Sequence, residues 1–359
     1  MTSTALRASR ALELIGAVHE GAAESAADSP LVLATRDPRN LLVVEDAGAV
    51  VSACAVLERT FVVGGERLRV GLVGAVSTAP AHRGRGFASR LLESAERELA
   101  ARGCALALLW AEDPRFYHLR GWRPIGAEDD YLLPPMLGAR LPRCDSRLAR
   151  PADAARLHEL ASAHPTRVER TLDEMRALLA CRDMRVRVAE DGARISAYTC
   201  CGRGRDLQGV VHEWGGAENG VLGLLARELA ELPSGLPGLF VMAPADAHGL
   251  RERLATLDVH PMRGILGLGK VLDRRALAEL LLRRVAPLGR VELATNARGG
   301  SEVVLRGMRG GGVLSDDSLL AVLFSERGLR DDIDALGAAF GFDASRLPLA
   351  PFAFGLDGI

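Results

Sequence analysis

Two arginines and two glycines alternate in the loop RGRG at residues 83–86, between two regular patterns. Upstream, residues 68–76 are mostly apolar and β-branched, which predicts a strand with Gly71 and Gly74 as bulge or close-approach positions. Downstream, apolar residues recur at helical spacing, and the helix is expected to begin at about Gly84. A helix N-terminus offers unpaired N–H groups and a positive dipole, and arginines add charged donors. This loop could therefore hold a diphosphate.

Other interpretations of the loop compete with the diphosphate site. The loop could mark only a turn, because short glycine patterns are common in a chain with 39 glycines. A Rossmann or Walker nucleotide site fits less well, since no GxGxxG follows the strand and the loop holds no lysine. An RGG-type nucleic-acid segment also fits poorly, because a single RGRG without interleaved aromatic residues is too short.

Residues on both sides of the loop resemble a known family. The order RxxGxA at 83–88, preceded by VxTxP at 76–80, resembles the acetyl-coenzyme A signature of the GNAT N-acetyltransferases. Residues 105–110 predict the next strand, and FYHLRGW at 116–122 then resembles the FYxxxGF element of that family. An alanine and a tryptophan stand where the family more often has glycine and phenylalanine. Two ordered matches make the resemblance specific.

The resemblance implies where acetyl-coenzyme A, the co-substrate, would bind. Residues 83–89 would hold its diphosphate, and the backbone of residues 76–78 would pair with its pantetheine arm. Tyr117 takes the position of the family's usual general acid. The expected coenzyme-binding residues are Val76, Ser77, Thr78, Arg83, Gly84, Arg85, Gly86, Phe87, Ala88 and Ser89.

The chemistry of amine attack on a thioester defines what else the site needs. It must hold both reactants together, stabilise an oxyanion and protonate the leaving thiolate. A backbone N–H near Thr78 could serve the oxyanion. A phenol with a pKa of about 10 starts protonated at neutral pH, so Tyr117 suits the role of acid. It could instead be a buried tyrosine that packs beside Phe116 and Trp122.

The general base has three candidates, because the strand before the loop contains no carboxylate. Glu112 and Asp113 follow the strand at 105–110, His118 adjoins the tyrosine, and the terminal carboxylate of Ile359 could return to the site. The acidic pair could equally be a solvated loop, and the histidine could be structural.

The chain of 359 residues is longer than one compact unit. A stretch rich in proline and arginine at 134–153 predicts a linker, and the pattern beyond it repeats the element order of the first half. We therefore expect an α/β (α+β) architecture with two tandem GNAT acyl-CoA N-acyltransferase folds, each a mixed, mostly antiparallel sheet with flanking helices. The expected domains are an active GNAT at 1–140, a degenerate GNAT-like domain at 150–284 and a small α+β module at 285–359.

The second half lacks an arginine loop at the corresponding place. It reads HEWGGAENG at 212–220, where Glu213 and Glu218 would repel a diphosphate. The second fold is therefore expected to form a wall of the acceptor site and to cover a sheet edge instead. His212, Glu213 and Trp214 could contact an amine substrate or could only end a strand.

The final residues, LPLAPFAFGLDGI at 347–359, are too apolar for a solvated end and predict a docked tail. The whole layout resembles the enhanced-intracellular-survival (Eis) type of multi-acetylating enzyme. In that group the terminal carboxylate acts as base, the last domain resembles a sterol carrier, and the subunits often assemble into rings. The resemblance implies a catalytic role for the carboxylate of Ile359, a sterol-carrier-like or truncated module at 285–359, and a homo-oligomer.

Composition limits the partners. With 48% apolar residues, 25% charged residues and a net charge of −1, the chain shows no excess of basic charge for nucleic acid. No apolar run approaches the ~20 residues that span a bilayer, and the amphipathic start does not resemble a signal peptide, so a cytoplasmic location is expected. Six scattered cysteines indicate reduced thiols and no metal site. The enrichment in Ala, Leu, Arg and Gly suggests a bacterial origin.

These observations predict an N-acetyltransferase that acts on a primary amine by direct attack in a ternary complex. An aminoglycoside, a polyamine or a lysine side chain would suit an acidic rim, or that run could be only a solvated loop. The candidate rim residues are Glu112, Asp113, Glu128, Asp129 and Asp130. The alternatives are a non-catalytic acyl-coenzyme A sensor or scaffold, and an aminoacyl-transferring double-GNAT enzyme.

Overall fold

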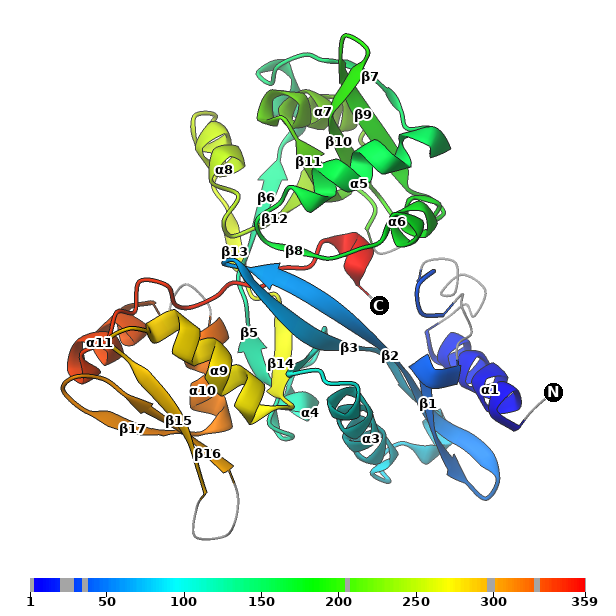
Figure 1. Ribbon diagram of the computed structural model, residues 1–359. Coiled ribbons are helices and arrows are strands. Elements are labelled where there is room, and N and C mark those ends of the chain that lie inside the picture. Colours follow the sequence, from blue (N-terminus) through cyan, green and yellow to red (C-terminus); the bar gives the residue numbers. More distant parts are fainter. Residues whose placement is uncertain are drawn as a thin grey trace.

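The computed structural model describes residues 3–19, 29–33, 38–203, 207–295, 301–325 and 330–358. These residues form two seven-stranded sheets and one three-stranded sheet. Figure 1 shows the sheets as three lobes, with the C-terminal segment running from the third lobe to a position between the other two.

The first sheet has the order β1-β2-β3-β4-β14-β5, with β8 paired to β2. Side chains alternate between its faces, so Ala53 and Ala55 of β2 pack beneath α1, whereas Cys54 and Val56 pack beneath α3. The elements of this lobe are α1 (Ser3–Val18), β1 (Leu41–Asp46), β2 (Ala49–Val63), β3 (Glu66–Thr78), α3 (Phe87–Ala101), β4 (Leu106–Leu109), α4 (Arg115–His118), β5 (Arg123–Ile125), β8 (Arg167–Val168) and β14 (Gly267–Val271), with 3-10 turns at Pro38–Asn40 and Pro80–His82.

The second sheet has the order β13-β6-β12-β11-β10-β9-β7. Helices α5 and α6 pack on one face around Tyr198, and α7 packs on the other. Its elements are β6 (Glu128–Leu133), β7 (Asp145–Leu148), α5 (Ala154–Ser162), α6 (Leu172–Leu179), β9 (Arg185–Asp191), β10 (Arg194–Cys201), β11 (Val210–Gly216), α7 (Glu218–Ala230), β12 (Leu239–Pro244), α8 (His248–Ala255) and β13 (Met262–Gly264), with 3-10 turns at Pro135–Ala139 and Pro151–Asp153. The predicted linker at 134–153 is wrong, because it contributes the edge strand β7.

The two large sheets share one topology and exchange a strand. In each, two antiparallel strands lead through a helix to a parallel strand, as β2-β3-α3-β4 and as β10-β11-α7-β12. The next position is filled by β14 in the first sheet and by β6 in the second, so each half of the chain completes the sheet of the other. The mixed, mostly antiparallel sheets agree with the predicted class. The domain limits at 140 and 150 remain a prediction, and the strands of the sheets do not divide there.

The third sheet is formed by β15 (Arg290–Thr295), β16 (Ser301–Arg306) and β17 (Gly311–Leu314). It is accompanied by α9 (Arg274–Val285), α10 (Asp316–Phe324) and α11 (Arg330–Phe340). Strand β17 begins at two glycines, Gly311 and Gly312.

The tail after α11 returns to the core, as the sequence predicts. Phe352, Phe354 and Leu356 are all less than 5% exposed. A short 3-10 turn, η6 (Gly355–Asp357), follows them. Ile359 lies outside the described residues.

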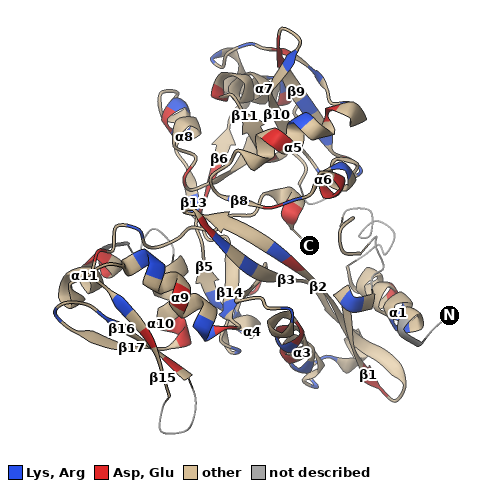
Figure 2. Cartoon of the chain, viewed as in Figure 1, with Lys and Arg blue, Asp and Glu red and all other residues tan. Residues whose placement is uncertain are grey.

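Charges of both signs are interspersed along the three lobes (Figure 2). Among the described helices, none is long and apolar enough to cross a membrane. Within the same residues, no group of three His, Cys, Asp or Glu side chains could hold a metal ion.

The tail should contribute directly to stability. Replacing Phe352, which is fully buried, by alanine removes a large apolar side chain and leaves a cavity, at a cost of about 3–5 kcal/mol. We expect a clearly lower midpoint of chemical denaturation, followed by tryptophan fluorescence. Met308→Ala is the control, because Met308 is 75% exposed and its loss should change stability by at most about 0.5 kcal/mol. Equal midpoints for the two variants would contradict tail docking.

Candidate functional site

Strand β3 extends beyond the end of its neighbour β4. The two pair in parallel only where residues 70–72 meet residues 106–108. Strand β4 ends at Leu109, whereas β3 continues to Thr78 while bonded to β2 on its other side. In the described part of the chain, no strand pairs with this second edge of residues 73–78. Backbone N–H and C=O groups there require partners, so an extended ligand can add to β3 as a strand would.

A bulge distorts β3 within this free edge. Ala75 has a positive φ of 51°, and the register with β2 shifts between Ala53 and Ala55. A bulge turns backbone groups away from the ladder, which can aim an N–H at a ligand. Of the two glycines expected to mark such features, Gly71 instead allows close helix packing, since a Cβ there would lie 2.6 Å from Leu99 of α3.

The loop between β3 and α3 brings its backbone N–H groups to one place. Gly84 and Gly86 have φ values of 74° and 80°, and Gly86 is the N-cap of α3. The helix therefore begins at Phe87 rather than near Gly84. A Cβ on either glycine would have no described atom within 4 Å, so the space above the loop is open. Arg83 Nε donates to Thr78 O at 3.2 Å, which fixes the guanidinium between strand and helix.

Arg120 also contacts the start of α3. This residue was not predicted from the sequence as part of the site. Its Nε and Nη2 donate to Ser89 Oγ at 2.9 and 2.6 Å, and it stacks 3.7 Å from the centre of the Phe116 ring. Arg85 pairs with Asp46 at 3.0 Å and lies 5.0 Å from the Phe87 ring centre. The only sequence signal for Arg120 is its place within the FYHLRGW element.

Tyr117 lies on the short helix α4 beside this loop. Its ring packs edge-on against Phe116 at 5.1 Å and Trp122 at 6.4 Å between ring centres. Tyr117 and Val76 of β3 pack against the same hydrophobic cluster under α3. Burial, with a smaller contribution from the Cys54 thiol, raises the pKa of Tyr117. The phenol is therefore protonated at neutral pH.

The base candidates differ in their surroundings. Hydrogen bonds from Arg115, whose Nη2 lies 2.7 Å from the carboxylate, lower the pKa of Asp113 to about 2, so it is a poor base. Glu112 is exposed. The Nε2 atom of His118 is buried without a hydrogen-bond partner among the described residues. The carboxylate of Ile359 lies outside those residues.

The acidic positions 128–130 on β6 are not a set of free carboxylates. Asp129 is buried and pairs with Arg251 at 2.5 Å. Burial, with the charge and hydrogen bond of Asp130, raises the pKa of Glu128 to about 8. Burial also raises the pKa of Asp130. Asp129 is therefore neutralised by its partner and Glu128 is protonated at neutral pH, so these two residues give an acceptor cation little negative charge.

In the second lobe, residues 212–215 of the segment expected to replace the arginine loop are buried, whereas residues 216–219 are exposed. Glu213 accepts hydrogen bonds from Arg170 at 2.8 and 2.7 Å and from Tyr198 at 2.8 Å. Burial lowers the pKa of His212 to about 4. Trp214 Nε1 donates to Met242 O of β12 at 2.9 Å. This geometry fits the structural interpretation of these residues.

Comparisons with known proteins agree with this geometry. Residues 10–125 match the family described as acetyltransferase (GNAT) domain. The fold resembles a GCN5-related N-acetyltransferase from Anabaena variabilis, with a TM-score of 0.66, 14% identity and coverage of 98% of this chain and 97% of that one. A GCN5-related N-acetyltransferase from Kribbella flavida gives a TM-score of 0.60 at 18% identity, with coverage of 100% of this chain and 99% of that one.

Eis1 from Mycobacterium abscessus gives a TM-score of 0.59 at 17% identity and covers 98% of both chains. No curated protein matches the chain in sequence. At such low identities the solved structures establish the fold, and the predicted Eis-like tandem GNAT architecture is confirmed.

Glu128 should make stability depend on pH. Its pKa of about 8 in the folded state lies above the ordinary value of about 4.3. The folded state therefore holds the proton more tightly, and stability falls as pH rises between these two values. We expect the melting temperature of Glu128→Gln to fall less than that of wild type between about pH 5 and about pH 9. Glu112→Gln, on an exposed residue, should follow wild type, and a Glu128→Gln profile parallel to wild type would contradict the shift.

Proposed function

Residues 10–125 form a GNAT acetyltransferase domain, and from this premise we propose that the chain transfers an acetyl group from acetyl-coenzyme A to a primary amine. The observation that carries the proposal is the free edge of β3 at residues 73–78, directly followed by the glycine loop at the N-terminus of α3. An extended amide-containing arm and a diphosphate, the two ends of the coenzyme, require these two features in this order.

The chain binds the coenzyme mainly through its backbone. The N–H and C=O groups of residues 76–78 pair with the pantetheine amides, as a neighbouring strand would. The N–H groups of residues 84–89 and the positive end of the α3 dipole bind the diphosphate. Arg83 and Arg120 supply charged donors. These contacts position the thioester at the bulge of β3.

The transfer is a direct attack in a ternary complex. A backbone N–H at the Ala75 bulge stabilises the oxyanion, because it is fixed in direction before the reaction begins. Tyr117 donates the proton to the departing thiolate. The base is the terminal carboxylate of Ile359, by resemblance to Eis-type enzymes. Support for it comes from the tail, whose described end packs against the second lobe beside β2 of the first sheet.

The acceptor is a small polyamine-like molecule, such as an aminoglycoside, or a lysine side chain. Such amines are ammonium ions at neutral pH, so a base must take a proton before attack. The acidic rim expected at residues 128–130 is not part of this proposal, since Asp129 is paired with Arg251 and Glu128 is protonated at neutral pH.

Reversing the charge of Arg83 should abolish coenzyme binding. A charged hydrogen bond contributes about 1.5–3 kcal/mol, and Arg83→Glu replaces it by repulsion, so Kd should rise by about 100-fold or more. Calorimetric titration with acetyl-coenzyme A measures this. Arg97→Glu is the matched control, because Arg97 is exposed further along α3. Wild-type affinity in Arg83→Glu would contradict the diphosphate site.

Removing the Tyr117 hydroxyl should separate binding from turnover. Tyr117→Phe keeps the ring packing, so the Kd for acetyl-coenzyme A should stay unchanged. Loss of the acid should lower kcat by about 100-fold or more. A thiol-release assay with polyamine, aminoglycoside and lysine-peptide acceptors gives the rate, and Tyr131→Phe in the second sheet is the control. Unchanged turnover would exclude Tyr117 as acid. Binding without turnover in wild type would favour a coenzyme sensor.

A further inference from the structure

A cavity of about 700 Å³ lies where the three lobes meet. Its walls come from the β2–β3 turn, from α8 and β13 of the second lobe, from α9 and the end of α10 in the third, and from residues 345–350 of the tail. Figure 1 shows the β2–β3 turn, β13 and the tail close together between the lobes. The glycine loop follows the other end of β3, a strand of 13 residues that spans about 40 Å. The cavity is therefore separate from the proposed coenzyme site.

Arginines dominate the charged lining of this cavity. Four of them, on four different segments, line it, whereas Asp246 is the one acidic side chain among the described lining residues. The arginines are Arg251 of α8, Arg263 of β13, Arg284 of α9 and Arg346 of the tail. Guanidinium groups on separate segments can donate to one anion from several directions. The lining therefore suits an anionic ligand.

Arg284 is the most buried of the four, with 7% of its surface exposed. Its Nε and Nη2 donate to Arg346 O at 2.9 and 2.6 Å, and its Nη1 donates to Gly64 O at 2.9 Å. Its ion-pair contact among the described residues is long, at 4.0 Å to Glu66 Oε1. Burial, with the charge of Arg346, lowers the pKa of Arg284. A buried cation without a close counter-charge is costly, so a bound anion would stabilise it.

The other three arginines are only partly neutralised. Arg251 Nη2 lies 2.5 Å from Asp129 Oδ2, and Arg263 Nε lies 3.8 Å from Oδ1 of the same carboxylate. Arg346 Nη1 donates to a backbone oxygen, Arg283 O, at 3.0 Å. One carboxylate is thus shared by two arginines, which leaves positive charge at the cavity.

Three buried polar atoms of the lining residues have no hydrogen-bond partner in the part of the chain that the structure describes. They are Ser325 Oγ, Arg251 Nε and Asp246 Oδ1. Ser325 is 2% exposed, and the other oxygen of Asp246 accepts from Thr166 at 2.6 Å. Unpaired buried polar groups cost free energy. The hydroxyl and the guanidinium can donate to an anion, and the carboxylate oxygen can accept from a hydroxyl.

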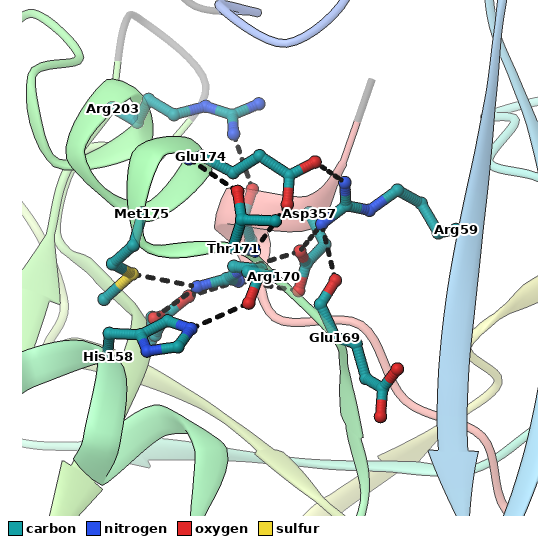
Figure 3. Close-up of polar contacts among 11 residues, drawn as sticks. Arg59, His158, Glu169, Arg170, Thr171, Glu174, Met175, Arg203 and Asp357 are labelled. Carbon is teal, nitrogen blue, oxygen red and sulfur yellow. Dashed lines mark hydrogen bonds and ion pairs between the residues drawn. The ribbon is translucent and has the colours of Figure 1, made fainter.

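The tail that forms one wall of the cavity is fixed on both sides. Leu349 N donates to Leu323 O of α10 at 2.7 Å. Further along, Arg170 donates to both oxygens of Asp357 at 2.8 and 2.6 Å and to both oxygens of Glu213 in β11 (Figure 3). The wall is therefore in place before a ligand binds, which lowers the entropic cost of binding. The buried ionic group is called the Arg170 cluster, and its members are Arg59, Arg170, Glu174, Glu213 and Asp357.

We propose that this cavity binds a phosphate monoester that carries hydroxyl groups, of which glycerol 3-phosphate is a small representative. A phosphate monoester is mostly a dianion at neutral pH and has three acceptor oxygens that point in different directions. A planar carboxylate offers only two, so phosphate better matches arginines on separate segments. The Ser325 hydroxyl adds a donor, and Asp246 accepts from a hydroxyl of the ligand. This inference does not depend on acetyl transfer.

Calorimetric titration of the full chain with glycerol 3-phosphate and with citrate tests the proposal. Saturating acetyl-coenzyme A is present to fill the diphosphate loop. If the coenzyme does not bind, the same titration is made without it, and the variants below locate the site. We expect glycerol 3-phosphate to bind, and to bind more tightly than citrate. No binding of glycerol 3-phosphate, or tighter binding of citrate, would overturn the proposal.

Two variants place the ligand in this cavity. In Arg284→Gln, which removes the buried guanidinium, the Kd for glycerol 3-phosphate should rise about tenfold or more. In Ser325→Ala, which removes the unpaired hydroxyl, it should rise by about 2- to 10-fold. Arg283→Gln is the matched control, because Arg283 precedes Arg284 in α9 but pairs with Glu66 outside the lining. Unchanged affinity in both variants, or an equal loss in the control, would contradict the site.

A variant of Asp246 tests the hydroxyl contact. Asp246→Ala should weaken glycerol 3-phosphate by about tenfold, because it removes an acceptor for the ligand hydroxyl. Inorganic phosphate should bind this variant at least as tightly as wild type, since a negative charge is lost. Equal weakening of both ligands would overturn the assignment of a hydroxylated ligand. If Arg284→Gln does not fold, Arg263→Gln, on a side chain that is 62% exposed, replaces it with the same expected direction.

Discussion

A β-strand that separates from its neighbour leaves a row of backbone N–H and C=O groups that must find other partners. Both large sheets of this protein contain such a strand, β3 in the first and β11 in the second, at the same place in the same topology. In the second sheet the tail and the Trp214 indole take up that space. In the first, a bulge at Ala75 lies within the free edge and a glycine loop follows it, as a coenzyme arm and diphosphate require. An open edge on β3 and an occupied edge on β11 thus distinguish the proposed active fold from the second GNAT-like fold.

The two lobes depend on each other at two levels. Strand β6, from the first half of the chain, completes the second sheet, and β14, from the second half, completes the first. Neither sheet is therefore complete with the strands of its own half. The Arg170 cluster then joins the tail to the second lobe and to β2 of the first. Removing one partner of a buried ion pair of this kind costs about 3–5 kcal/mol, because it leaves an uncompensated charge. The arrangement therefore favours a single relative placement of the tail and the two sheets.

Features built from contiguous residues could be predicted from the sequence, whereas pairings between distant segments could not. The loop at 83–86 was predictable because strand, glycines, arginines and helix are contiguous; only the helix start was misplaced, since two left-handed glycines precede Phe87. Strand β6 was missed because it begins with three acidic residues, and its exchange with β14 has no local signal. Arg170 and Asp357 are 187 residues apart, so only the fold brings them together. The buried tail was predictable from its aromatic residues, but its ionic partner was not.

The central claim is that acetyl-coenzyme A binds at the free edge of β3 and not at the matching edge of β11. Hydrogen–deuterium exchange of the full-length protein, with and without acetyl-coenzyme A, tests it most directly. The account predicts slower exchange of the amides in residues 76–90 on binding, with residues 210–220 unchanged because the tail already lies against β11. Protection confined to residues 210–220, or no protection of residues 76–90 at saturating coenzyme, would contradict it.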